Sequence, residues 1–344
     1  MGVRISMKKQ YVDVIIPTYN GLPWLLSTIE SVRLQTYKYI KIYIVDDGST
    51  DDTEKAIMGI KDKRIYYLKK SNGGVSSARN YGIKESNSEF VSFLDSDDLW
   101  HKDKIEKQLK IINKNSEVGM VYGQHNIIDE NNNIIGELKI YNRGKLFDTL
   151  LNGNTIAGSA SMVLVRRTVL NKAGYFREDI VNGEDWEMWL RISLRCEIDY
   201  CQDIIASIRN HPQSAQKNIE KMTDSLVYAY SVMRDEFDLN ENQRHHLANY
   251  CLYNSSIHYY NLGRFDKSRN TLSLLLKESR RSAHDPNNWM PKVHIQNGPF
   301  TKIFITKPIV HNILSIFLLP LRLIKLTKRI IKSILRRIKA HVNS

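Results

Sequence analysis

The chain has 344 residues and a net charge of +13, and 42% of its residues are hydrophobic and 25% are charged. This composition excludes a disordered, collagen-like or multiply membrane-spanning protein, and the length allows two domains or one domain with appendages. Three cysteines without a CxxC pair exclude a disulfide framework and favour a reducing compartment. The basic start is not followed by an apolar segment of about 7–15 residues, so we expect no secretory signal.

The positive charge is concentrated in one segment. Between Lys302 and Lys339 there are ten Lys or Arg residues and no Asp or Glu, which leaves a net charge of about +3 for residues 1–301. A nucleic-acid-binding protein would carry its basic residues over a folded face. We therefore expect no nucleic-acid partner.

The first 115 residues alternate between strand and helix patterns. We expect strands at Val12–Pro17, Ile40–Val45, Ile65–Leu68 and Phe90–Leu94, and helices at Leu22–Gln35, after Thr50 or Asp51, at Ser76–Ile83 and from near Leu99. Glu54 is placed to complete a capping box for the second helix, and Asp97 or Asp98 to cap the fourth. This alternation predicts an α/β fold, with a mostly parallel sheet covered by helices on both faces.

The rest of the chain is less regular and then becomes helical. Short strands are expected at Met120–Tyr122, Ile134–Ile140 and Ser161–Val165, and helices from about residue 216. Residues 256–277 resemble a single tetratricopeptide helix pair, which cannot bury its own faces. We therefore divide the chain into a catalytic domain at 9–215, a helical region at 216–300 and a basic amphipathic tail at 301–344.

Polar side chains follow three of the predicted strands. They are Thr18-Tyr19-Asn20, Asp46-Asp47 and Asp95-Ser96-Asp97. Ligands of open α/β sheets bind beyond the carboxyl ends of the strands, so these groups should converge in space. A tyrosine ring can stack on a base, a carboxylate can accept from a base N–H or a ribose hydroxyl, and paired carboxylates can hold a hydrated divalent metal. The three groups together predict a nucleotide site.

Five sequence blocks resemble family 2 glycosyltransferases, which are inverting enzymes with the GT-A fold, a Rossmann-like α/β fold. The blocks read VDVIIPTYN, IYIVDDGSTDDT, SNGGVSSARNYGI, FVSFLDSDDLW and GEDWEMWLRIS, and the resemblance, of bacterial type, covers about residues 11–215. It implies a nucleotide-sugar donor, UDP-linked by preference, and a divalent metal, Mn²⁺ or Mg²⁺. It also implies a hexosyl or N-acetylhexosaminyl group in transfer to a saccharide or lipid-linked saccharide, as in surface polysaccharide synthesis.

The resemblance also implies a role for each matching residue. At the nucleotide, Pro17, Thr18 and Tyr19 would line the base pocket, Asp46 would accept a hydrogen bond from the base, and Arg79 and Ser96 would lie nearby. At the metal, Asp95 would bind ribose close to the ion, Asp97 would ligate it, and His211 could be a further ligand. On the acceptor side, Asp185 would be the general base, and Glu184 would orient it or bind acceptor. Arg209 and His211 belong to a late basic segment that in this family often returns to the donor phosphates. For Arg79 a structural ion pair, and for Glu184 and Asp185 a solvated helix start, remain the alternatives.

The chemistry of glycosyl transfer requires the same two kinds of group. Negative charge that develops on the leaving diphosphate must be neutralised, and a metal at Asp97 would do this without proton transfer. The acceptor hydroxyl must lose its proton as it attacks, which requires a carboxylate such as Asp185 on the opposite side of the sugar. Direct displacement then inverts the anomeric centre.

The tail suggests where such an enzyme would work. Its longest uncharged stretch, Pro308–Leu321, is 14 residues long, short of the roughly 20 that cross a bilayer. Isoleucines and leucines at helical spacing follow, with Lys and Arg between them, as in an interfacial helix. We expect a cytoplasmic enzyme, peripheral on the inner face of the cell membrane, although a helix that packs on protein remains possible. The rival functions are a sugar-nucleotide-forming nucleotidyltransferase and a non-catalytic, basic-tailed binding protein.

Overall fold

The structure, a computed structural model, describes residues 9–156, 159–214 and 217–281. The chain forms two compact units, Met1–Cys251 and Leu252–Ser344. The predicted tail at 301–344 lies outside the described residues. The first unit contains the sheet and every predicted site residue.

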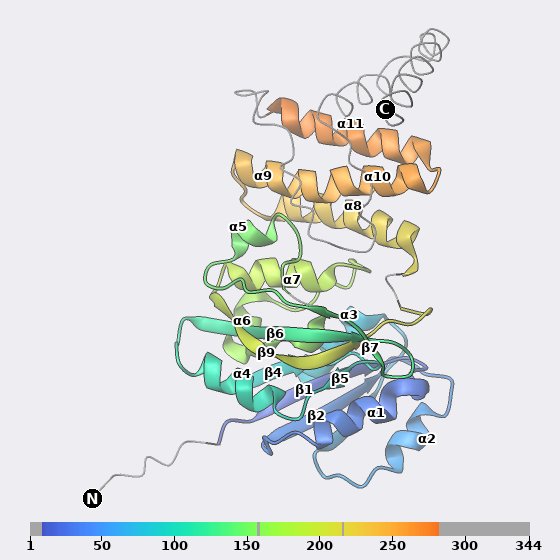
Figure 1. Cartoon of the computed structure of the whole chain (residues 1–344), viewed down its shortest axis with the longest axis vertical. Helices are drawn as coiled ribbons and strands as arrows, with labels where there is room; N and C mark the ends of the chain where they lie inside the picture. The colour runs from blue at the N-terminus through green and yellow to red at the C-terminus, as the bar shows by residue number, and fades with distance from the viewer. Residues whose placement is uncertain (1–8, 157–158, 215–216, 282–344) are drawn as a thin grey trace, which may run out of the picture. The chain divides into compact units, whose positions relative to one another are not determined.

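A nine-stranded mixed sheet forms the core of the first unit (Figure 1). Its strands are β1 Val12–Thr18, β2 Ile40–Asp46, β3 Ile65–Lys69, β4 Phe90–Phe93, β5 Leu99–Trp100, β6 Val118–Ile128, β7 Ile134–Leu138, β8 Leu164–Arg166 and β9 Glu197–Arg209. Their order is β3-β2-β1-β4-β8-β6-β9-β5, and β7 pairs with β6. Strands β1, β2, β3 and β4 are parallel to one another, as predicted. The later strands add antiparallel pairs.

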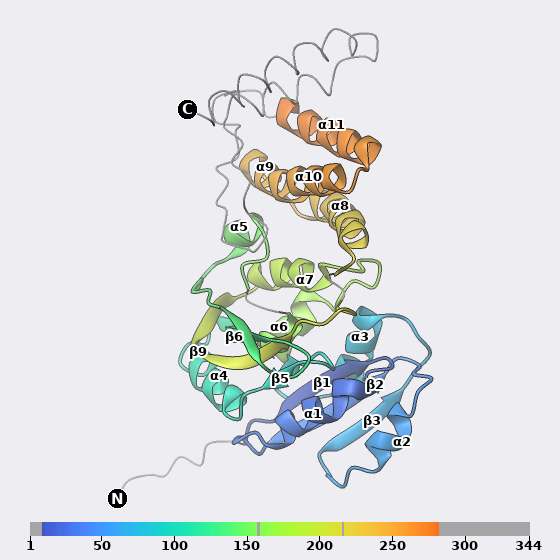
Figure 2. The ribbon, with the colours of Figure 1, turned by 45° about the vertical axis from the view of Figure 1, so that its right-hand side comes forward.

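Helices cover both faces of this sheet, with α1 and α4 on one side and α3 and α6 on the other (Figures 1 and 2). The helices between the strands are α1 Leu22–Arg33, α2 Thr53–Met58, α3 Val75–Glu85, α4 Lys104–Ile112, α5 Phe147–Leu150, α6 Arg167–Ala173 and α7 Glu184–Ser193, with a 3₁₀ turn, η1, at Ala160–Met162. Strand β1 is buried along its whole length, as its unbroken apolar run predicts. Since β1, β2 and β4 run in the same direction, their polar carboxyl ends meet at one edge.

Two predicted helix starts are wrong. Helix α2 begins at Thr53 after Asp52, without a side-chain cap, so Glu54 completes no capping box and instead pairs with Lys69. Residues Leu99–Trp100 form the short strand β5, and α4 begins only at Lys104. The side chain of Asp98 is engaged by partners from distant segments and is unavailable as a cap.

Strand β9 was not predicted, although it is the longest strand of the sheet. It runs parallel to β6, and the register shifts at several points between Val118 and His125. These irregularities, together with polar residues such as Gln202 and Asp203, break the alternation by which strands are recognised. Strand β9 is important for the site because its end carries Arg209 and, two residues later, His211.

Helices follow the sheet, as expected from about residue 216. They are α8 Ile219–Glu236, α9 Glu241–Ala248, the π-helix η3 Asn249–Tyr253, α10 Asn254–Asn261 and α11 Phe265–Arg281. Within the second unit, α10 and α11 form the predicted helix pair, joined by a turn in which Gly263 has a φ of +72°. Among the described residues, no helix is long and apolar enough to cross a membrane.

Candidate active site

The loops after β1 and β2 are joined by Asn20. Asn20 has a φ of +51°, and its Oδ1 accepts a hydrogen bond of 2.8 Å from the backbone N–H of Thr50. The ring of the adjacent Tyr19 is 53% exposed, whereas Pro17 and Thr18 are buried. The buried hydroxyl of Thr18 has no hydrogen-bond partner among the described residues. Tyr19 is therefore the member of this predicted group that offers an open ring face.

Asp46 lies at the end of β2 and is completely buried. Its Oδ2 accepts from the Tyr67 hydroxyl at 2.6 Å, and its Oδ1 accepts from the backbone N–H of Ser49 at 2.7 Å. Burial alone would raise the pKa of Asp46, but these hydrogen bonds hold it below its ordinary value. Asp46 is thus an ionised acceptor buried at the end of β2.

The neighbouring carboxylate of Asp47 has a structural role. It accepts from Lys70 Nζ at 2.6 Å and from the backbone N–H groups of Gly73 and Gly74. These bonds fix the glycine loop in front of α3. Asp47 therefore holds the loop that positions α3 and, with it, Arg79.

Asp95, Ser96 and Asp97 follow β4 at the same edge. A Cβ built on Gly21 would lie 2.5 Å from Thr18 Oγ1 and 3.2 Å from Ser96 Oγ, so the β1 and β4 loops approach each other closely there. Asp97 Oδ2 lies 2.8 Å from His211 Nε2, and the His211 ring packs against Trp24 with 4.2 Å between the ring centroids. The sheet thus brings together Asp97 and His211, which are 114 positions apart in sequence.

The side chains of Asp95, Asp97 and His211 are of types that bind divalent metals, and Asp97 and His211 also have a suitable spacing. Two adjacent ligands of an octahedral cation with bonds of about 2.1 Å lie about 3 Å apart, close to the separation of Asp97 Oδ2 and His211 Nε2. Burial, and next the charge of Asp95, raise the pKa of Asp97, a strain that a bound cation would relieve. Asp95 Oδ1 is engaged by Arg79, and no group of three or more His, Cys, Asp or Glu residues in the described part of the chain forms a closed metal site.

Two further residues, Asp98 and Arg209, support this edge through contacts that the sequence did not predict. Asp98 is buried, and its side chain accepts from Ser161 Oγ at 2.6 Å and from the backbone N–H of Arg209 at 2.9 Å. The Arg209 guanidinium donates to the carbonyl oxygens of Asp97 and Asp129 and to the Asn132 side chain. Arg209, which the family resemblance relates to the donor phosphates, here ties β9 to the loop after β4. Trp24, against His211, was also missed.

Arg79 connects this edge to α7. It is 3% exposed, and its guanidinium donates to Asp95 Oδ1 at 2.7 Å and to Glu184 Oε1 at 2.8 Å. It also lies over the Phe176 ring, with 5.2 Å to the centroid. The two acidic neighbours raise the pKa of Arg79 although burial opposes this, so the group stays charged. Arg79 therefore forms an ion-pair bridge between the predicted nucleotide carboxylate and the predicted acceptor side.

Glu184 and Asp185 begin α7. Glu184 is almost fully buried and Asp185 is half-buried, while Trp186 and Trp189 are in the core. Asp185 Oδ1 accepts from the backbone N–H of Trp186 at 2.6 Å. Burial, and next the charge of Glu184, raise the pKa of Asp185 to about 7. The pair is thus not the solvated helix start that the sequence left open, and Asp185 has the proton affinity of a general base near neutral pH.

Comparison with known proteins identifies the family of the chain. The sequence profile of glycosyl transferase family 2 matches residues 13–174. The Escherichia coli enzyme WfgD, a UDP-Glc:alpha-D-GlcNAc-diphosphoundecaprenol beta-1,3-glucosyltransferase, is 35% identical over 187 residues, which cover 54% of this chain and 71% of the relative. The chain belongs to glycosyl transferase family 2. An uncharacterized glycosyltransferase of Rickettsia felis is 38% identical over 200 residues, 58% of this chain but only 33% of that relative.

Solved structures show the same fold. S. aureus TarS 1–349 in complex with UDP-GlcNAc superposes with a TM-score of 0.61 at 20% identity, covering 78% of this chain and 81% of that one. The mannosyltransferase PcManGT from Pyrobaculum calidifontis, in complex with GDP-Man and Mn²⁺, superposes with a TM-score of 0.56 at 16% identity and covers 81% of this chain and 77% of that one. The family 2 chain has the GT-A fold that its sequence predicts, followed by helices.

Proposed function

We propose that the chain is a metal-dependent inverting glycosyltransferase that moves a hexosyl or N-acetylhexosaminyl group from a UDP-sugar to a saccharide or lipid-linked saccharide. The observation that carries this proposal is the Arg79 bridge. It joins Asp95, beside Asp97 and His211, to Glu184, beside Asp185. A donor held at the first group would therefore present its anomeric carbon toward the second.

Each group has a distinct task in this proposal. Tyr19 would stack on the base, and Asp46 would accept a hydrogen bond from it. Asp95, Asp97 and His211 would hold a Mn²⁺ or Mg²⁺ ion, which supplies charge neutralisation at the diphosphate. Asp185 would take the proton of the attacking hydroxyl, and Glu184 would keep Arg79 in place beside it. Ser96 would contact the nucleotide from the loop between the two aspartates.

The acceptor class rests on similarity and on the surface near the site. The named activity of WfgD is toward a lipid diphosphate-linked saccharide. Strand β7 follows the hairpin turn that Arg209 holds, and it exposes Ile134 and Ile135, which are 64% and 55% accessible. Apolar side chains beside a saccharide site would suit an acceptor that carries a lipid. The substitution Ile135→Ser should weaken transfer to a lipid-linked acceptor and leave transfer to a water-soluble analogue unchanged.

Attachment of the tail to an anionic membrane surface remains a proposal, since those residues lie outside the described part. Ten cationic side chains near an anionic leaflet would each contribute about 1 kcal/mol, less as salt screens them. Flotation with phosphatidylglycerol vesicles should be weakened by salt and lost on truncation before Lys302. Equal flotation of the truncated chain would remove the support for a peripheral inner-face location.

The proposed activity is tested by screening UDP-Glc, UDP-GlcNAc and GDP-Man with and without Mn²⁺, using thermal shift and release of the nucleoside diphosphate. We expect a UDP-sugar to bind and to be consumed only when the metal is present. A nucleotidyltransferase would instead release pyrophosphate from UTP and a sugar phosphate. A chain that binds no nucleotide sugar would support the non-catalytic alternative.

A further inference from the structure

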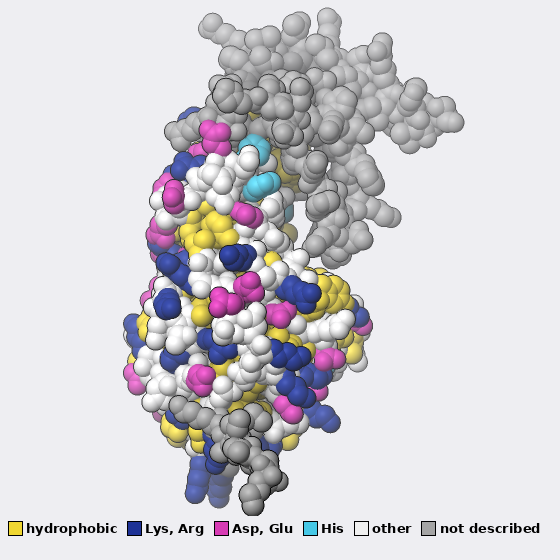
Figure 3. All heavy atoms as spheres, turned by 90° about the vertical axis from the view of Figure 1, so that its left-hand side faces the viewer, with side chains coloured by type: hydrophobic (Ala, Val, Ile, Leu, Met, Phe, Trp, Pro, Cys, Tyr) yellow, Lys and Arg dark blue, Asp and Glu magenta, His cyan; other side chains and the backbone are white. Residues whose placement is uncertain are grey.

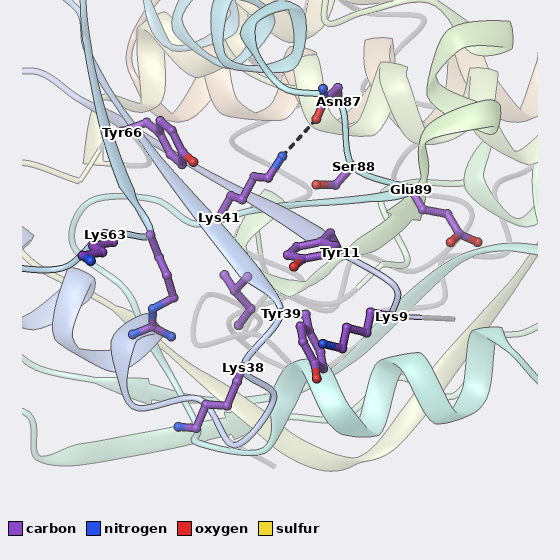
Figure 4. Close-up of a pocket in the computed structure, with 12 residues that line it drawn as sticks. Lys9, Tyr11, Lys38, Tyr39, Lys41, Lys63, Tyr66, Asn87, Ser88 and Glu89 are labelled. Atoms are coloured by element: carbon purple, nitrogen blue, oxygen red, sulfur yellow. Dashed lines mark hydrogen bonds between the residues drawn. The ribbon is translucent and has the colours of Figure 1, made fainter. Parts of the chain in front are cut away.

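A groove opens at the opposite edge of the sheet from the active site. It has a cavity volume of about 660 Å³ and lies where β1, β2, β3 and β4 begin (Figure 4). Its walls include Lys9, Lys38, Lys41, Lys63, Tyr11 and Tyr39. We call it the lysine–tyrosine groove. Because β1 has seven residues, the groove lies about 20 Å from the catalytic edge, at roughly 3.3 Å per residue.

The groove has uncompensated positive charge. None of its four lysines lies within ion-pair distance of a carboxylate in the described part of the chain. Arg64, which also lines it, is neutralised by Asp62 at 2.8 Å, and one carboxylate, Glu89, faces it. Lys41 Nζ donates to Asn87 Oδ1 at 3.0 Å, and an ammonium has three donors, so it keeps capacity for a ligand. The groove therefore favours an anion.

The groove also presents flat rings between these charges. Tyr11 and Tyr39 meet edge to face with 5.6 Å between centroids. Lys9 Nζ lies over the Tyr39 ring at 5.1 Å, and Lys41 Nζ lies over the Tyr11 ring at 5.8 Å. Tyr11 is 42% exposed, and Tyr66, 43% exposed, lines the same groove. The exposed parts of these rings can pack against a flat or ring-shaped ligand, and the lysine cations lie next to them. The site thus combines ring contacts with anion recognition.

We propose that the lysine–tyrosine groove is a second saccharide-binding site, selective for glycans that carry carboxylate or phosphate groups. Its volume is that of a site for a discrete ligand of a few rings. A nucleic-acid surface would extend over a larger basic face, yet one face of the molecule shows Lys and Arg interspersed with Asp and Glu (Figure 3). If this groove lay on a membrane, the catalytic edge would point away from it. The choice of a saccharide rests on the proposed function, and the requirement for an anion does not.

The site would hold an acidic part of an acceptor or product glycan away from the reacting end. Binding there involves no bond making, so it can be measured without turnover. The probe is tetragalacturonic acid, with neutral maltotetraose as its uncharged counterpart, and calorimetry on the full chain gives the dissociation constants. We expect the acidic tetrasaccharide to bind at least tenfold more tightly. Equal affinities, or no binding of the acidic probe, would overturn the proposal.

Matched variants test whether the acidic probe binds in the groove. Lys38→Glu with Lys63→Glu should weaken binding of the acidic probe at least tenfold, while Lys55→Glu with Lys110→Glu, the same charge change on exposed helix residues elsewhere, should change it less than twofold. Tyr11→Phe should retain binding and Tyr11→Ala should lose most of it. An equal effect of both double substitutions would show a general charge effect and refute the site.

Two further probes test the other occupants. An eight-nucleotide oligo-dT or phosphatidylglycerol vesicles that bind the groove more tightly than the acidic tetrasaccharide would reassign it to nucleic acid or to membrane. UDP-sugar binding is measured in the same preparations. If the chain binds the UDP-sugar but not the acidic probe, only the proposal for the groove is refuted. If it binds the acidic probe but no UDP-sugar, only the proposed function is refuted.

Discussion

Asp97 Oδ2 and His211 Nε2 lie 2.8 Å apart at the edge where β4 and β9 end. Either a shared proton or a shared cation can join two such atoms, and the two cases differ in their response to metal. The carboxylate of Asp97 has its pKa raised by burial and by Asp95, so it gains most from a cation. The pair is therefore the most informative place to test the proposed metal.

We expect Asp97→Ala to abolish turnover and to remove the Mn²⁺ dependence of UDP-sugar affinity. His211→Ala should weaken that dependence with a smaller loss, because one carboxylate ligand would remain. Asp103→Ala, which removes a carboxylate that pairs with Lys107, is the control. Calorimetry with and without Mn²⁺ gives the result, and unchanged metal-dependent affinity in the Asp97 variant would contradict the assignment.

The second prediction concerns the proton acceptor. Asp185→Asn keeps the shape of the side chain but cannot accept the proton, so transfer should fall by roughly 10²–10⁴ while donor affinity survives. In the parent enzyme kcat/KM should rise with pH through about 7, as the free carboxyl ionises. Transfer rates across pH 5–9 check both points. If transfer falls less than a few-fold, Asp185 is not the base, and Glu184→Gln becomes the variant to examine.

The raised pKa of Asp185 should also make the stability of the folded chain depend on pH. A folded-state pKa above the unfolded value means that the folded chain binds more protons between about pH 4 and 7, so stability declines as pH rises through this window. Asp185→Asn removes one such group. It should raise the Tm at pH 8 by roughly 1–2 °C, equivalent to about 1 kcal/mol in a protein of 344 residues. Near pH 4 the variant and the parent should melt together, and a gain of equal size at both pH values would point to packing instead.

The sequence allowed the meeting of the polar strand ends at one edge to be predicted, because the information there is local. Unbroken apolar runs such as Val12–Pro17 identify buried parallel strands, and parallel strands place Asp46 and Asp95 at one edge. The contacts of Asp98 could not be predicted in this way. Its partners Ser161 and Arg209 come from segments more than sixty positions away, and they override the local preference of an aspartate to cap a helix.

The irregular strand β9 is a second feature that could not be predicted from the sequence. Its register shifts against β6 remove the two-residue period, so the element that delivers His211 had no pattern to reveal it. The candidacy of His211 as a further metal ligand, with Asp97, accordingly came only from the family resemblance. Arg79 was placed near the nucleotide in the same way, but its bond to Glu184 needed the packing of α3 near α7.

The last prediction uses Arg79, the residue that joins the two halves of the site. Arg79→Gln would leave the carboxylates of Asp95 and Glu184 without their cation, and loss of one partner from a buried ion pair costs about 3–5 kcal/mol. The positive charge of Arg79 also lowers the pKa of Asp185, so its removal should shift the pH dependence of kcat/KM to higher pH. Arg167→Gln is the matched control, because Arg167 pairs with buried Asp13 away from the catalytic edge. Both variants should melt earlier, but only Arg79→Gln should move the pH profile. A parallel loss of stability with no shift in the profile would show that Arg79 is a structural ion pair and does not influence the base.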